Sequence, residues 1–235
     1  KQARYSKPKP PMQNKALNLT AELEKAYKKL TQQKQNLIKT GFKPLDEKLS
    51  YCTYGNIISF AGTLNHELFL NLVREFSIQN KKCLYFFKDY KHERFLMELL
   101  TLNSSFYDDN KEVAKDKMQN WQISLYDNKF SDIKDFHKII ETEKPDYIFI
   151  DALNNIKIQS PLDTELSETD YFLEQLKMSI QETNSIALIK TGEVMFEGID
   201  TNLLNSRILK NVSDIIIATS FRLSVSIIFE GLRSL

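Results

Sequence analysis

Glycine is scarce in this sequence. Only 6 of the 235 residues are glycine, against an average of about 7% in proteins. Loops that wrap a phosphate with backbone amides depend on glycine, so the chain has few residues from which to build one. Cysteine is rarer still: Cys52 and Cys83 are the only two, and they lack metal-ligand spacing. This content predicts a reducing, cytoplasmic compartment and no structural disulfide.

A charge bias and long apolar runs are also missing. Lys and Arg number 32 and Asp and Glu 31, so the net charge indicates neither a nucleic acid nor a membrane partner. No apolar run approaches the ~18 residues of a membrane span, and the polar start is unlike a signal peptide. What is present, 42% hydrophobic and 27% charged residues, is typical of a globular domain that can bury a core.

Basic residues and prolines dominate residues 1–18. The segment has five basic residues, three prolines and no acid, which is the composition of a flexible arm. Two interpretations stay open: a solvated end, which we favour, or an arm that contacts nucleic acid weakly. The cations concerned are Lys1, Arg4, Lys7, Lys9 and Lys15.

The next segment, residues 19–38, is predicted to be helical over 20–38. Thr20 is placed to cap the helix, and Glu22 and Glu24 put acids into its first turn. Leu23 and Tyr27 belong to an apolar stripe on one side, with Lys and Gln elsewhere. Such a stripe packs either on its own domain or on a neighbouring protein.

From residue 55 onward, predicted strands and helices alternate. Several strands are continuous apolar runs such as "YIFI" and "IALI", as expected where helices cover both faces of a sheet. The alternation predicts an α/β fold with a mainly parallel sheet flanked by helices. The last two strands, joined by "SFRL", are predicted to form an antiparallel hairpin. Strands are expected at 56–61, 83–87, 122–126, 147–151, 186–190, 214–219 and 224–229, and helices at 67–79, 92–101, 131–143 and 168–182.

The most specific string is "TGFKPLD", residues 40–46. With the strand that follows, it resembles the entry to RecA-fold ATPase domains, and most closely the C-terminal domain of DnaB-type replicative helicases. In that family a Thr-Gly-Phe-x-x-Leu-Asp stretch leads into the P-loop strand. The resemblance implies a RecA-like domain over 39–235. It also matches residues 19–38 to the family's linker helix, which docks on the adjacent subunit of a ring.

The same resemblance implies positions for a nucleotide site. Asp151 follows "YIFI", where the family has its Walker B acid, and Asp89 matches a catalytic glutamate just past the second strand. Lys190 ends a strand that carries a polar sensor in the family. We expect both acids to be vestigial. Polar capping of the sheet edge is the interpretation that we slightly favour for them.

The expected P-loop departs from the family pattern. A working loop reads Gly-x4-Gly-Lys-Ser/Thr; its Lys meets the phosphates and its hydroxyl holds Mg²⁺. Counted from Gly62, the closing triplet is Glu67-Leu68-Phe69; aligned by the following helix, it is Asn65-His66-Glu67, with a shortened loop. Neither triplet contains Lys, Gly or a hydroxyl. The degenerate loop comprises Gly62, Thr63, Asn65, His66, Glu67, Leu68 and Phe69, with the Glu67 carboxylate expected where a phosphate would lie.

These departures predict a pseudo-ATPase: a non-catalytic binding or assembly protein of DNA replication or recombination, with no cofactor and no metal site. The partner would be another protein or a second copy, bound through helix 20–38, with no membrane contact. The alternative is a divergent ATP-dependent helicase or ATPase with an unorthodox P-loop, for which ATP and Mg²⁺ would be cofactors. Loops 152–170 and 191–206, which would line a DNA channel, carry one Lys and no cation respectively, which argues against translocation on DNA.

Overall fold

A computed structural model of the protein divides the chain into two units, Lys1–Asn36 and Leu37–Leu235. In the first unit every described residue is helical, starting at Leu19. The predicted N-cap at Thr20 is therefore wrong, because Leu19 before it already has helical backbone. The basic arm, 1–18, lies outside the described residues. The structure describes residues 19–20, 23–25, 27–28, 38–50, 52–62, 65–87, 92–105, 107, 110–127, 132–151, 153, 168–191, 213–219 and 225–230.

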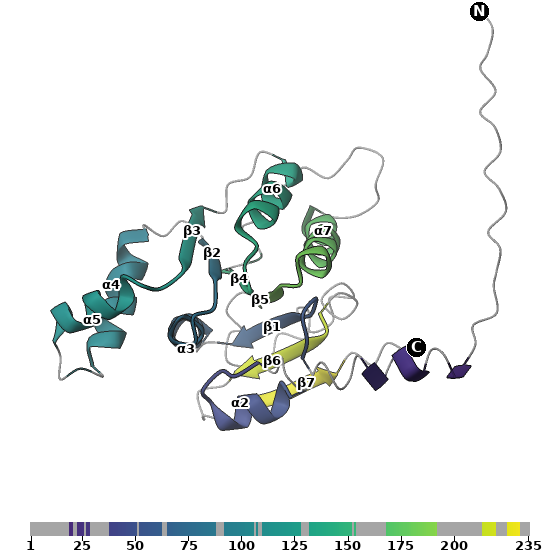
Figure 1. Ribbon diagram of the computed structural model, residues 1–235, viewed down its shortest axis with the longest axis horizontal. Coiled ribbons are helices and arrows are strands. Elements are labelled where there is room, and N and C mark those ends of the chain that lie inside the picture. Colours follow the sequence, from purple (N-terminus) through teal and green to yellow (C-terminus); the bar gives the residue numbers. More distant parts are fainter. Residues whose placement is uncertain are drawn as a thin grey trace, which may run out of the picture. The chain divides into compact units, whose positions relative to one another are not determined.

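The second unit is built on a seven-stranded sheet in the order β3-β2-β4-β5-β1-β6-β7 (Figure 1). All pairings from β3 to β6 are parallel, and β7 pairs antiparallel with β6. The predicted mainly parallel α/β fold is confirmed. The turn of the predicted hairpin, 220–224, lies outside the described residues. The strands are β1 (Ile57–Gly62), β2 (Cys83–Phe87), β3 (Ile123–Asp127), β4 (Tyr147–Ile150), β5 (Ile186–Lys190), β6 (Ile215–Thr219) and β7 (Val225–Glu230).

Helices occupy the connections, and two of them were not predicted. The short α5 (Lys111–Met118) is mostly polar, so apolar periodicity misses it; it is held at its start by the Asn110 side chain, which accepts from the backbone N–H groups of Glu112 and Val113. The other is α2 (Lys43–Lys48), with Pro44 in its first turn. No described helix has the length and apolar character to cross a bilayer. The remaining helices are α3 (Asn65–Ile78), α4 (His92–Ser104), α6 (Ile133–Glu143) and α7 (Glu168–Thr183).

Both faces of the sheet are covered, which explains the continuous apolar strands. Successive side chains of a strand point to opposite faces. In β1, Ile58 and Phe60 belong to the cluster formed with α2, α3 and α4, whereas Ile57 belongs to the cluster formed with α6 and α7. Figure 1 shows α6 and α7 on one side of the strands and α3 on the other. Every residue of β2 and β4 is consequently buried.

An aromatic layer joins α3 to the sheet. The Phe149 ring of β4 lies 5.4 Å from the ring of Phe69 and 5.7 Å from that of Tyr85, measured between centroids. Further along α3, Phe76 stacks on Tyr147 at 3.8 Å. These contacts fix α3 against β4, so the first turn of α3 is held close to the carboxyl edge of the sheet.

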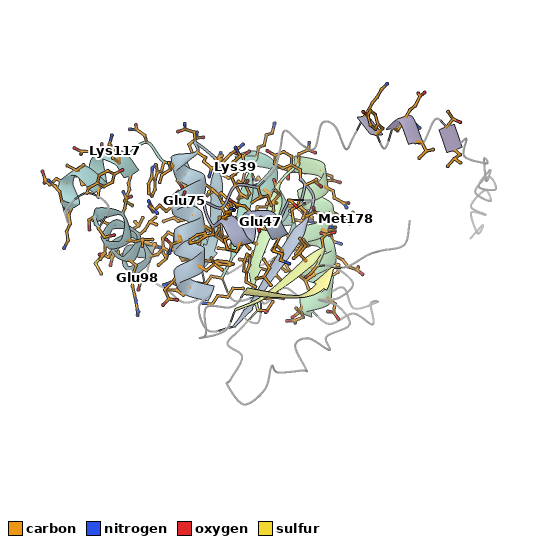
Figure 2. The ribbon with its side chains drawn as sticks, turned by 90° about the horizontal axis from the view of Figure 1, so that it is seen from below. Lys39, Glu47, Glu75, Glu98, Lys117 and Met178 are labelled. Carbon is orange, nitrogen blue, oxygen red and sulfur yellow. The ribbon has the colours of Figure 1, made fainter. Side chains whose placement is uncertain are left out.

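The "TGFKPLD" string forms a closed turn ahead of the sheet. Both the backbone N–H and the hydroxyl of Thr40 donate to Asp46 Oδ1 at 2.6 Å. Between Thr40 and Asp46, Gly41 has φ +79°, a backbone conformation that favours glycine. A Cβ at Gly41 would lie 2.9 Å from a carboxylate oxygen of Glu75, a residue of α3 that is labelled in Figure 2. The string thus has a structural role, because Thr40, Gly41 and Asp46 shape the turn.

Candidate functional site

The predicted site residues gather at one edge of the sheet because parallel strands bring their carboxyl ends together. β1 ends at Gly62, Asp151 directly follows β4, and Lys190 ends β5. β5 lies between β1 and β4. Lys190 is therefore placed between the Asp151 strand and the strand that leads into the expected phosphate loop. The topology brings together the ends that the family resemblance matched to a nucleotide site.

Asp151 is buried and contacts polar side chains of two neighbouring strands. Its side chain is 7% exposed, and its Oδ1 lies 3.1 Å from the Nζ of Lys190. Its Oδ2 accepts a hydrogen bond from the Tyr85 hydroxyl at 3.3 Å. The backbone N–H of Asp151 donates to Phe86 O at 3.0 Å, which holds the residue beside β2. The structure thus joins Asp151 and Lys190 directly, as an ion pair.

The loop after β1 is short. α3 begins at Asn65, which leaves only Thr63 and Leu64 between the end of β1 and the helix. A P-loop needs four residues between its two glycines, and their backbone N–H groups supply the phosphate contacts. The start of α3 matches the second alignment considered above, in which Asn65-His66-Glu67 takes the place of Gly-Lys-Ser/Thr. That this connection does not wrap a triphosphate in the usual way stays a prediction.

His66, at the lysine position of that alignment, is bound to another helix. Its Nε2 lies 2.7 Å from Glu98 Oε2 on α4, and Arg94 donates to the other oxygen of Glu98 at 2.9 Å. Partial burial raises the pKa of Glu98, but the hydrogen bonds from His66 and Arg94 outweigh it, so the net pKa lies below its ordinary value. Glu98 therefore stays ionised at neutral pH and keeps His66 directed toward α4, on the left of Figure 2.

The other loop residues have separate environments. Phe69 is buried between Phe60 and Phe149, each at 5.4 Å between ring centroids. Leu68 is half-buried and packs against the same core, so both side chains contribute to the packing of α3. Glu67 lies in the first turn of α3 with an exposed side chain. Its placement where a phosphate would lie stays a prediction.

Several predicted features lie outside the described residues. Among them are Asp89, the second candidate acid, and Thr63 of the loop. Most of the two loops expected to line a DNA channel, 154–167 and 192–206, belongs to the same group. Among the residues that the structure does describe, no three His, Cys, Asp or Glu side chains gather to hold a metal ion.

The two thiols carry no chemistry in the folded state. Cys52 and Cys83 are both free and buried. Burial raises the pKa of the Cys52 thiol to about 12, with a further contribution from Asp214, and burial likewise raises the pKa of Cys83 to about 12. Because the thiolate is the reactive form, neither residue serves as a nucleophile at neutral pH.

Two residues at the site were missed by sequence reasoning. Tyr85 donates to Asp151, and the buried Thr191 hydroxyl donates to Phe60 O at 3.1 Å, which ties the end of β5 to β1. A signal for Tyr85 existed: a tyrosine within the buried run "CLYFF" needs a partner for its hydroxyl. Its neighbour across the sheet, Asp151, could have been inferred from strand order but not from spacing.

Comparison with known proteins finds matches among solved structures. One, described as an ATPase domain, matches with a TM-score of 0.72 and 14% identity over 92% of this chain and 92% of that one. A DnaB-like replicative helicase, described with its interactions with primase, matches with a TM-score of 0.70 and 16% identity over 88% of this chain. The match spans 57% of that helicase. No family model and no curated protein sequence matches. The chain has the RecA-like fold of DnaB-like helicase ATPase domains, as the sequence predicted.

Proposed function

We propose that this protein is a DnaB-helicase-like domain with a degenerate nucleotide site, which acts by binding and assembly in DNA replication or recombination. One observation carries the proposal: among the residues that the structure describes, two side chains expected near the phosphate position already have partners of their own. His66 is bound to Glu98, and Lys190 is paired with Asp151. Each would have to leave its partner to meet a triphosphate.

The charge balance at the start of α3 opposes a nucleotide. A helix N-terminus attracts anions through its free N–H groups, and a P-loop adds a lysine to that attraction. Here Glu67 contributes a negative charge to the same turn. Two like charges about 4 Å apart repel by roughly 4 kcal/mol at a near-surface dielectric. A penalty of that size removes most of the affinity of an ordinary nucleotide site.

The first unit supports a role in assembly. Leu19, Leu23 and Tyr27 follow one another at four-residue spacing and are 73%, 58% and 69% exposed. Residues four apart lie on one side of a helix, so these three form an apolar stripe. An amphipathic helix of this kind binds by laying its apolar side into a groove of a partner. A second copy of this chain, or another subunit of the same fold, is the partner we propose.

The nucleotide part of the proposal is tested with the full chain. Isothermal titration with Mg-ATP should give no binding heat, and phosphate release should equal that of a no-protein blank. Asp151→Asn should behave as the wild type in both assays. ATP turnover by the wild type that Asp151→Asn abolishes would instead establish the divergent ATPase.

The assembly part has a matched pair of variants on one helix. Leu23→Gln changes the apolar stripe, whereas Glu24→Gln introduces the same residue at the next position along the helix. Losing one buried leucine contact should weaken association roughly ten- to hundredfold. Sedimentation velocity over a concentration series measures this, and Glu24→Gln should match the wild type. Equal association of both variants, or a wild type that remains monomeric throughout, would contradict assembly through this helix.

A further inference from the structure

Three neighbouring strands contribute one polar side chain each to a cluster at the carboxyl edge of the sheet. Tyr85 comes from β2, Asp151 follows β4, and Lys190 ends β5; the sheet order places β4 between the other two. The Lys190 ammonium lies 3.1 Å from one carboxylate oxygen, and the Tyr85 hydroxyl lies 3.3 Å from the other. The side chain of Lys190 is 18% exposed and that of Asp151 is 7% exposed. The cluster is thus largely shielded from water.

We propose that Lys190 is the built-in counter-cation of Asp151, so that this carboxylate does not take a divalent metal ion. This deepens the proposed function, and rests on it, by giving the acid at the Walker B position a role that requires no ligand. A divalent ion prefers ionised oxygen ligands without a competing cation. Here one oxygen is already paired with an ammonium, and that positive charge repels a second cation at close range.

The burial of Asp151 explains why a cation is needed at position 190. A carboxylate as buried as Asp151 is costly to keep ionised unless a positive charge or several donors compensate it. Tyr85 supplies a neutral donor, and Lys190 supplies the positive charge. The ion pair also links the ends of β4 and β5, so the edge is organised without a nucleotide.

The cluster predicts a specific pattern of stabilities. Removing one partner of a buried ion pair leaves an uncompensated charge, whereas removing both leaves none. Lys190→Met should therefore lower the melting temperature at neutral pH. Adding Asp151→Asn to that variant should restore part of the loss. Lys81→Met serves as the control, because Lys81 pairs with Asp146 at 3.6 Å with side chains 36% and 30% exposed, and exposed pairs contribute little.

The experiment uses the full chain and follows melting temperature with and without Mn²⁺ or Mg²⁺. The expected result has two parts: neither ion raises the melting temperature of the wild type relative to Asp151→Asn, and the double variant melts above Lys190→Met. Either of two results overturns the inference. One is a metal-dependent rise in the wild type that Asp151→Asn abolishes; the other is a double variant that melts no higher than Lys190→Met. Because neither readout reports ATP turnover or association, failure here is distinguishable from failure of the proposed function.

Discussion

Replacing Phe149 by alanine should be among the most damaging single changes to this fold. Phe149 is fully buried, and its ring contacts those of Phe69, Phe76 and Tyr85. Two of these rings belong to α3 and one to β2, so a single side chain joins a helix to two strands. Truncation removes that apolar surface and leaves a cavity that rigid neighbours fill poorly. Such Phe-to-Ala changes cost about 3–5 kcal/mol.

That cost translates into a large shift in chemical denaturation. With a loss of about 4 kcal/mol and a urea m-value of about 2 kcal/mol/M, the midpoint should fall by about 2 M. Trp121, the only tryptophan, is half-buried against the same core and reports unfolding by fluorescence. An unchanged m-value would show that the midpoint shift reflects stability rather than a different unfolded state.

Two further variants make the comparison decisive. Phe149→Leu keeps much of the apolar volume and should cost about 1.5 kcal/mol or less. Met178→Ala truncates a side chain that is 53% exposed on α7 and should change stability by no more than about 0.5 kcal/mol. If Phe149→Ala moves the midpoint no further than Met178→Ala does, the aromatic layer does not hold α3 against the sheet.

Two other predictions concern backbone conformation and pH. Gly41→Ala should destabilise the domain by about 1–2 kcal/mol because φ is +79° there. Lys144→Gly, at the left-handed C-cap of α6 with φ 46°, should instead be neutral or stabilising by up to about 1 kcal/mol. Urea midpoints measure both changes in stability, and a loss of stability in both variants would contradict the backbone argument. The second prediction is that Glu143→Gln lowers the urea midpoint at neutral pH. A hydrogen bond from Lys82 lowers the pKa of Glu143 below its ordinary 4.5 and outweighs the opposing effect of partial burial; Tyr126 and Ser124 also donate to this carboxylate. A lowered folded-state pKa stabilises the fold above pH 4.5, and this stabilisation is lost as the pH falls through the folded-state pKa. The urea midpoints of wild type and variant should therefore converge in acid, and a constant difference between the midpoints across the pH range would contradict this assignment.

The local pattern of apolar residues was sufficient to predict the class of fold. Continuous apolar strands such as Tyr147–Ile150 predicted a sheet covered on both faces, because no polar residue interrupts them. The alternation of strands with helices predicted parallel pairing, because a crossover helix returns each strand in the same direction. The short, polar α5 was missed because it has little apolar periodicity and is specified mainly by its cap at Asn110.

What the sequence by itself determined was the class of fold, since that follows from residue types at regular spacing along the chain. Only the tertiary structure decided which partners the polar and charged side chains have. Lys190 and Asp151 are 39 positions apart, and His66 and Glu98 are 32 apart; their pairing depends on strand order and helix packing. Electrostatic interactions act through space over a few ångströms, so no spacing rule within the sequence could have assigned those partners.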